Sequence, residues 1–329
     1  MRIGKFKLYR LFLALALLTV LYNLQDNYIQ QVNSVLEEGE TSSVKNIESP
    51  SLVKQKNKIT PPVETSTDKT EKVVLTETIE KTPTPPQNLT ASGQSLEPQV
   101  KPGHVVFQVK MDNWLVTHGD ILLGQLKEPV TFTQGQYKPP APKLWEQSRI
   151  PYVIADNYPY PELIEDVIAY FRENTPIRFV KPQAQDKDGI VFQLGEEHCY
   201  SFLGKMGGFQ PIFLAEECRG PQIIHEILHA LGFIHEQSRT DRDNYLEIMW
   251  SEIQADFRAQ FMKVPTSYML GMKNSKFDYR SAMLYQPTAF ANNPGTEVMK
   301  SKTKNRISPT QEGLSAGDIE RLIQVYGTL

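Results

Sequence analysis

The balance of apolar and polar positions along the chain changes near residue 103. Residues 25–102 are rich in Thr, Glu, Lys, Ser and Pro and contain few apolar clusters. Such a segment cannot bury enough apolar surface to offset the entropy lost on ordering, so we predict an extended tether there. Short apolar runs appear afterwards, beginning with a cluster at 105–109. We therefore expect folded structure only from residue 103 onward.

The pattern after residue 143 predicts strands that alternate with helices. Short apolar runs predict three strands, at 150–154, 177–180 and 190–194. Between the first two, residues 161–174 repeat their apolar positions at helical spacing. A terminal helix follows the cap-like pair Ser315 and Asp318 and continues to residue 326. This order predicts an α+β fold in which a twisted sheet packs on helices.

The first residues of the chain indicate its compartment. Four basic residues precede the apolar run 11–22, namely Arg2, Lys5, Lys7 and Arg10. This is the order of a secretory signal. The run is shorter than the roughly 20 residues of a membrane span, and no small-x-small cleavage site follows it closely. We predict that residues 1–24 direct the chain out of the cytoplasm, to be secreted or held in the periplasm or cell envelope. Both a cleaved signal peptide and an uncleaved membrane anchor remain open.

Composition excludes two classes of function. The formal net charge is −3, whereas a nucleic-acid-binding chain would show a concentrated excess of Lys and Arg. We therefore exclude nucleic acid as a partner. The two cysteines, Cys199 and Cys218, lie 19 positions apart. That separation suits one disulfide but not a zinc ribbon, which needs close cysteine pairs. Two buried free thiols are the alternative.

Residues 223–236, Ile-Ile-His-Glu-Ile-Leu-His-Ala-Leu-Gly-Phe-Ile-His-Glu, carry the strongest chemical signal. Residues four apart on a helix point in similar directions, so His225 and His229 can bind one ion together. Gly232 can adopt the left-handed conformation that ends the helix, and His235 can then supply a third nitrogen. Three neutral nitrogens and an open position are typical of catalytic zinc. We therefore predict one Zn²⁺ bound by these three histidines.

Glu226 is the candidate general base. It points away from the neighbouring ligand around the helix, so its carboxylate is free to face a zinc-bound water. Zinc lowers the pKa of that water to about 7, and a nearby carboxylate can take the proton and pass it to the leaving amine. The spacing arises by chance with a probability on the order of one in a hundred thousand, which disfavours histidines merely packed on a core helix. Oxidative iron chemistry is also disfavoured, since it would need a ligating carboxylate.

Several segments resemble the astacin family of the metzincin class. The histidine motif continues into a matching stretch at 233–245, and residues 281–285 supply the methionine turn of the class. Further matches occur at 144–145, 150–152, 177–180, 277–279 and 314–318. The resemblance covers about 143 to 327. It implies that residues 143–329 form a two-lobed, zincin-like metzincin catalytic domain. In that fold a twisted mixed sheet and the active-site helix lie above an irregular C-terminal lobe.

The resemblance implies roles for further residues. Met283 would form the apolar floor under the zinc, and Tyr285 would be a movable ligand that swings away to stabilise the tetrahedral oxyanion. Glu236 matches an acidic residue that contacts the mature N-terminus in a buried pocket, and a surface carboxylate is the alternative. Residues 210–215 resemble the edge strand to which an extended substrate adds in antiparallel orientation. An ordinary core strand is the alternative for that segment.

Residues 117–121, Thr-His-Gly-Asp-Ile, resemble the propeptide motif whose aspartate fills the open position of the zinc. Asp120 is therefore the candidate latency switch, and an ordinary Gly-Asp turn is the alternative. The resemblance identifies 103–142 as the inhibitory prosegment of a bacterial-type member of the family. Activation would then require a protease that cuts somewhere between residues 124 and 144.

The chain departs from the family pattern at two places. A second disulfide is expected to reach the C-terminus, but Pro176 stands at its first position and the chain ends without cysteine. The remaining pair, Cys199 and Cys218, matches the bridge that closes the loop ahead of the metal helix. One bridge contributes about 3 kcal/mol, so packing must offset the missing one. Leu284 stands where many relatives have histidine, and we expect no loss of zinc because that position is not a ligand.

The sequence favours a zinc-dependent endopeptidase that is made as a zymogen and acts on proteins or peptides. A catalytically inactive zinc-binding adhesion or binding module on the same scaffold is the alternative. Such a module would have no chemical need for Glu226 beside three zinc ligands. An envelope-anchored structural element would account for the tether, but it leaves the metal site unexplained.

Overall fold

The computed structural model describes residues 80–81, 96–110, 113–128 and 130–327, all within the compact unit Asp68–Leu329. The predicted signal peptide or anchor at 1–24 and most of the predicted tether at 25–102 lie outside the described residues. Within the described part of the chain, no helix combines the length and apolar character needed to cross a membrane.

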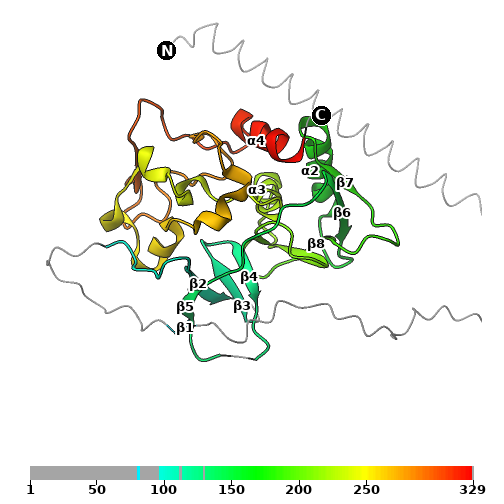
Figure 1. Cartoon of the computed structure of the whole chain (residues 1–329), viewed down its shortest axis with the longest axis horizontal. Helices are drawn as coiled ribbons and strands as arrows, with labels where there is room; N and C mark the ends of the chain where they lie inside the picture. Colours follow the sequence, from blue (N-terminus) through cyan, green and yellow to red (C-terminus); the bar gives the residue numbers. More distant parts are fainter. Residues whose placement is uncertain (1–79, 82–95, 111–112, 129, 328–329) are drawn as a thin grey trace, which may run out of the picture. The chain divides into compact units, whose positions relative to one another are not determined.

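Among the described residues, ten strands form one sheet in the order β1-β5-β2-β3-β4-β9-β10-β8-β6-β7. In Figure 1, β1 to β5 lie together at the bottom of the view, and β6 and β7 lie at the right beside α2. Its strands are β1 (Glu80–Lys81), β2 (Val105–Lys110), β3 (Trp114–Thr117), β4 (Ile121–Gln125), β5 (Gln134–Tyr137), β6 (Arg149–Ile154), β7 (Arg178–Val180), β8 (Gly189–Leu194), β9 (Tyr200–Phe202) and β10 (Phe209–Leu214). A separate pair joins β11 (Leu246–Ile248) to β12 (Met299–Ser301).

The large sheet has an antiparallel half and a mostly parallel half. Strands β1 to β5 pair with one another in antiparallel orientation, and β5 returns to lie beside β2. Because β2 to β5 fall within the predicted prosegment, we call this group of strands the prosegment meander. In the other half, the pairs β10-β8, β8-β6 and β6-β7 are parallel, and β9 runs antiparallel to β10. The two halves meet where β4 pairs parallel with β9. The strands predicted at 150–154, 177–180 and 190–194 are confirmed as β6, β7 and β8.

Helices α2 (Pro161–Asn174) and α3 (Gly220–Ala230) pack against the parallel half and form the main core with it. The helix predicted at 161–174 is confirmed with the same limits. Its first residue is a proline, which has no amide hydrogen to leave unpaired, and it ends where the Thr175 amide donates to the Phe171 carbonyl. The buried residues shared by the helices and strands include Ile164, Val167, Ile168, Phe171, Ile190, Phe192, Ile212, Ile223, Ile227 and Leu228.

Residues 231–315 contain little regular structure, as the predicted C-terminal lobe implied. Five short 3-10 helices occur there: η1 (Glu236–Ser238), η2 (Arg242–Asn244), η3 (Trp250–Glu252), η4 (Ala255–Phe261) and η5 (Thr266–Met272). The lobe has its own apolar cluster, which includes Leu246, Phe261, Leu284, Val298 and Met299. The chain then enters α4 (Ala316–Tyr326), where the Ser315 hydroxyl accepts from the Asp318 amide at 2.9 Å. The predicted terminal helix and its cap are confirmed.

The mostly parallel half of the sheet falls within the predicted catalytic domain, and we call it the catalytic half. Its edge strand beside the prosegment meander is not the one that we predicted. Residues 210–215 fall on β10, which lies between β8 and β9 in the interior of the sheet. This half ends in β7 on one side and in β9 on the other, and it is β9 that pairs with the prosegment meander. Only three residues long, β9 gives no periodic signal in the sequence, and its place in the sheet depends on contacts with distant residues.

Some residues of the predicted tether contact the prosegment meander. Its residues Glu80–Lys81 pair with β5 of the meander. The Gln136 side chain on β5 donates to the Gln99 carbonyl at 3.1 Å and accepts from the Lys101 amide at 3.0 Å. Part of the polar, proline-rich segment is therefore held by hydrogen bonds to its backbone rather than by the burial of apolar side chains, which is why composition did not reveal it.

Candidate metal centre

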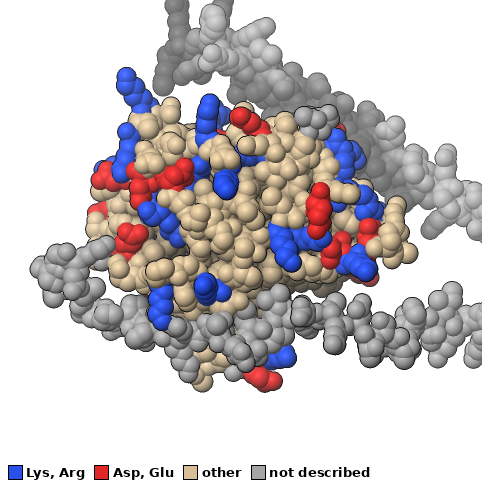
Figure 2. All heavy atoms as spheres, in the orientation of Figure 1, with Lys and Arg blue, Asp and Glu red and all other residues tan. Residues whose placement is uncertain are grey.

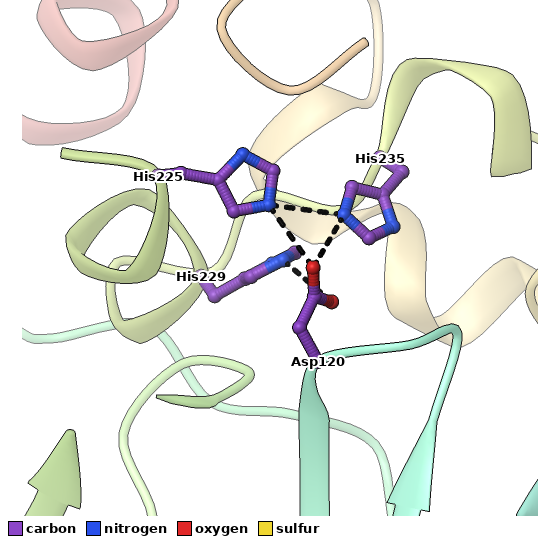
Figure 3. A group of neighbouring side chains, drawn as sticks. All are labelled: Asp120, His225, His229 and His235. Carbon is purple, nitrogen blue, oxygen red and sulfur yellow. Dashed lines mark hydrogen bonds and ion pairs between the residues drawn. The ribbon is translucent and has the colours of Figure 1, made fainter. Parts of the chain in front are cut away.

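Three histidines from α3 and the turn after it point toward one spot (Figure 3). His225 and His229 lie one turn apart on the helix, as predicted. The helix ends at Ala230, and the chain turns back at Gly232, which has a φ of 94° and where a Cβ atom would approach Leu144 Cδ2 to 2.5 Å. This reversal brings His235 back, so that its Nε2 lies 3.0 Å from Nε2 of His225. The sequence prediction that these residues converge is therefore confirmed.

Backbone carbonyls fix the orientation of two of the three rings. Nδ1 of His225 lies 2.9 Å from the Ala282 carbonyl, and Nδ1 of His229 lies 2.8 Å from the Phe233 carbonyl. A carbonyl can only accept, so Nδ1 carries the hydrogen in both rings and Nε2 keeps its lone pair. Burial lowers the pKa of His235 to about 3 and also lowers the pKa of His229. Neutral imidazoles with free Nε2 atoms are the form that binds a metal.

Asp120 lies opposite the histidines, at the start of β4. Its Oδ2 lies 3.3 Å from Nε2 of His225 and 3.2 Å from Nε2 of His235, and its Oδ1 lies 3.2 Å from Nε2 of His229. Asp120 Oδ1 and His229 Nε2 are both buried without a hydrogen-bond partner among the described residues. An ionised carboxylate and a bare nitrogen repel each other unless a cation lies between them. Three imidazole nitrogens with one carboxylate oxygen are a donor set that suits Zn²⁺.

Glu226 lies on α3 beside the first histidine and is 2% exposed. Its Oε2 has no hydrogen-bond partner in the described structure. Burial, followed by the negative charge of Asp120, raises the pKa of Glu226 well above its ordinary value. Glu226 lines a cavity of about 520 Å³ together with His225 and Asp120. A carboxyl group with a raised pKa beside a metal site can accept and then release a proton near neutral pH.

Tyr285 contacts His118, which lies in the predicted prosegment. Its hydroxyl lies 3.0 Å from the His118 carbonyl and 3.2 Å from Gln260 Oε1, and it donates to these acceptors. Its ring centroid lies 4.8 Å from that of His235. Burial, and then the charges of Asp120 and Glu226, raise its pKa well above the ordinary value, so the hydroxyl stays protonated and can donate.

The methionine turn is bonded to the residue that follows the third histidine. Met283 is buried in the main core, and its carbonyl accepts from the Glu236 amide at 2.8 Å. Leu284 belongs to the apolar cluster of the C-terminal lobe and lines the cavity.

Glu236 is fully buried, so the alternative of a surface carboxylate is wrong. Its Oε1 contacts the guanidinium of Arg321, and its Oε2 lies 3.4 Å from Arg239. Burial raises its pKa to about 7, and the two arginines oppose that shift. The counter-charges of Glu236 thus come from within the chain. Its contact with a mature N-terminus stays a prediction.

Cys199 and Cys218 form a disulfide, not two free thiols. The bridge joins the residue before β9 to the loop before α3, and both cysteines line the cavity. It therefore ties the edge strand to the helix that carries two of the histidines.

Two residues near the site were not predicted to belong to it. Gln260 accepts from Tyr285, and no pattern in the sequence marks it. Asp318, which we assigned only to a helix cap, accepts from the Ser281 hydroxyl at 2.6 Å and from the Ala282 amide at 2.8 Å. Asp318 thereby holds Ala282, whose carbonyl orients the ring of His225. Because 36 residues separate Asp318 from Ala282, no local spacing could reveal this contact.

Residues 138–327 match the family model described as astacin, a peptidase family. The chain is 40% identical over 185 residues to zinc metalloproteinase nas-13 of Caenorhabditis elegans, which covers 55% of this chain and 40% of that protein. It is 35% identical over 213 residues to meprin A subunit alpha of Rattus norvegicus, which covers 63% of this chain and 27% of that protein. Among solved structures, high choriolytic enzyme 1 of Oryzias latipes, a hatching enzyme zinc-protease, matches with a TM-score of 0.50 and 33% identity, covering 56% of this chain and 93% of that one. The chain thus spans less than half the length of either curated relative.

Proposed function

Because this chain belongs to the astacin family of peptidases, we propose that it is a zinc-dependent endopeptidase made in a latent form. The observation that carries the proposal is the convergence of three histidine nitrogens beside the unpaired carboxyl of Glu226. Structural zinc sites use four permanent protein ligands, whereas three imidazoles leave one position for a reactant. In the described state, that position faces Asp120.

The residues around the site can perform peptide hydrolysis. Zn²⁺, when bound to the three histidines, supplies a Lewis acid that polarises a carbonyl and acidifies water. Glu226 takes a proton from the attacking water and passes it to the leaving nitrogen. Once the prosegment carbonyl of His118 has left, the Tyr285 hydroxyl is free to donate to the oxygen on which negative charge develops.

Two contacts support the latent state. Asp120 lies within 3.3 Å of each histidine Nε2 and thereby fills the position that a reactant needs. In addition, Ile121 and Leu122 pair along β9, which is the edge where an extended peptide would add as a strand. A substrate cannot enter while both contacts persist. We infer that a protease cuts the connection between the prosegment and residue 144 to start activation.

We infer that the substrates are proteins or peptides outside the cytoplasm. A cavity of about 520 Å³ that is flanked by a strand edge suits an extended polypeptide. Figure 2 shows acidic and basic side chains interspersed over the face that it displays. That face therefore offers no broad field of one sign to select a strongly charged substrate. The basic and apolar start of the sequence supports export, as a secreted or an envelope-anchored protein.

The unaltered Glu226 argues against an inactive binding module. A module that only binds zinc or a protein partner has no use for a buried, unpaired carboxyl beside the metal site. Keeping that carboxyl group buried and unpaired costs free energy. A catalytic role accounts for this cost, whereas a role in adhesion does not.

The test compares the full chain before and after limited proteolysis, with an unlabelled protein and an internally quenched peptide as substrates. We expect one zinc per chain, an inactive uncut form and an active cut form. Glu226→Gln should keep the zinc and lose about 10²–10⁴-fold in hydrolysis. Glu320→Gln, which changes an exposed carboxylate on α4, is the matched control and should keep full activity. Zinc binding without cleavage by any cut form would favour the binding module, and absence of stoichiometric zinc would overturn both.

A further inference from the structure

The prosegment meander contacts the catalytic half of the sheet at a second place, away from the histidines. Trp114 on β3 lies edge-on to Phe213, with ring centroids 5.3 Å apart, and edge-on to Phe202 at 5.8 Å. These rings belong to one apolar cluster, the Trp114 cluster, which also contains Val116, Leu122, Tyr200 and Met206. No metal ligand belongs to this cluster, so the contact does not depend on the zinc.

The Trp114 cluster lies on the face of the sheet that α2 and α3 leave uncovered. Successive residues of a strand point to opposite faces. On β10, Ile212 and Leu214 belong to the main core with the helices, whereas Phe213 between them belongs to the Trp114 cluster. Phe209 shares the parity of Phe213 and is 39% exposed. Without Trp114, the rings of Phe202 and Phe213 would therefore lie on an open apolar face.

The meander also has a core of its own. Its buried members are Val105, Phe107, Leu115, Leu123 and Tyr137, none of which comes from the catalytic half. Strands β2, β3, β4 and β5 pair with one another through antiparallel ladders. A sheet of at least three strands with an apolar face can persist as a unit. A cut after β5 would therefore leave the meander and its Trp114 contact intact.

We propose that the prosegment stays bound to the catalytic part after the activating cut, anchored by Trp114 on a surface made by Phe202, Met206 and Phe213. The inference rests on the proposed latent peptidase and concerns its regulation. The partner of this surface is the severed prosegment of the same chain, which binds to the surface through the aromatic side chain of Trp114. Activity then appears in two stages, since the fragment must also dissociate or be degraded, and the free fragment inhibits in trans.

The experiment uses the full chain with a recognition sequence for a site-specific protease inserted between Pro140 and Ala141, both of which are exposed. After the cut, gel filtration and hydrolysis of a quenched peptide are followed over a series of protein concentrations. In the wild type, the fragment should coelute with the catalytic part, and activity should appear only on dilution. In Trp114→Ala, the protein concentration at which half of the fragment has dissociated should be about 30-fold higher than in the wild type, as for loss of an aromatic hot spot. Trp114→Phe keeps a ring and should stay within about threefold of the wild type.

Changes on both sides of the contact test whether it is direct. Phe213→Ala should weaken retention as Trp114→Ala does, and the double variant should lose little more than either single one. Cobalt replaces zinc in the uncut Trp114→Ala variant, and an unchanged visible spectrum shows that Asp120 is still seated. If the spectrum changes, the test of the anchor relies on Phe213→Ala instead, because that variant leaves the meander unaltered.

The outcomes separate the two proposals. A fragment that elutes apart from the cut wild type at every concentration, with full activity at once, overturns the retained prosegment and leaves the peptidase intact. If the wild type, Trp114→Ala and Phe213→Ala retain the fragment equally well, Trp114 does not anchor the prosegment. No hydrolysis by the catalytic part after the fragment has been removed contradicts the proposed function instead.

Discussion

At the scale of residues, the proposed latent state contains a histidine that is buried in its neutral form. His118, two positions before Asp120, is 3% exposed. Its Nε2 lies 3.2 Å from the Met262 carbonyl, and its Nδ1 lies 2.9 Å from the Thr117 hydroxyl. Burial lowers its pKa to about 4, whereas an unperturbed histidine titrates near pH 6.5. One partner of His118 belongs to the meander and the other to the C-terminal lobe.

We predict that acid weakens this latent arrangement through His118. Because its folded pKa lies below its unfolded value, the stability that it contributes is present in full above pH 6.5 and is lost as the pH falls toward 4. The loss amounts to about 2 kcal/mol at pH 5. Urea unfolding of the uncut chain at pH 7.5 and pH 5 measures it. His118→Gln should reduce the pH dependence by that amount, while the exposed His198→Gln should not. Identical pH dependence in His118→Gln and the wild type would contradict the prediction.

At the scale of elements, the sequence predicted those whose signal is local. Helix α2 was predicted with its true limits because its apolar spacing and its first proline are both visible in the chain. Strand β9 was missed because three residues carry no period, and β10 was assigned to an edge because sheet order depends on distant pairing. The 3-10 helices of the C-terminal lobe have no regular apolar repeat, so only the family resemblance indicated that lobe.

The same distinction applies to the candidate site. The three histidines could be predicted because one helix and the turn after it carry all of them. The ion pair of Glu236 could not, since its partner Arg321 lies on α4, far along the chain. The support that α4 gives to the methionine turn through Asp318 has the same origin and was not predicted.

We predict that α4 controls the affinity for zinc. Asp318 holds the Ala282 amide, and the carbonyl of the same residue orients His225. Loss of such an outer partner typically lowers metal affinity by about 10–100-fold. Asp318→Asn should therefore release zinc to a competing chelator at a correspondingly lower chelator concentration. Glu320→Gln, on the exposed side of the same helix, should bind zinc like the wild type. Unchanged affinity in Asp318→Asn would show that the turn keeps its shape without the carboxylate.

At the scale of the described fold, the metal site joins the two halves of the large sheet. Asp120 belongs to the prosegment meander, whereas the three histidines belong to the catalytic half. Apart from the metal site, the contacts of the meander with the rest of the described fold include the two paired positions of β4 and β9, the Trp114 cluster, Ile121 in the main core and the contact of His118 with the Met262 carbonyl. A ligand that binds only the folded state at about 1,000 times its Kd stabilises that state by about 4 kcal/mol. Zinc should therefore contribute much of the coupling between the halves.

This coupling predicts how the latent chain unfolds on heating. With zinc, calorimetry should show one cooperative transition, because both halves must open to release the ion. After chelation, the melting temperature should fall and the meander should unfold first, in a transition of its own. Asp120→Ala with zinc present should resemble the chelated wild type, since it removes the link but keeps the histidines. Asp186→Ala, which breaks a distant ion pair with Arg149, should keep the single transition. Two transitions in the zinc-loaded wild type would mean that the metal does not couple the meander to the catalytic half and that only their remaining contacts do so.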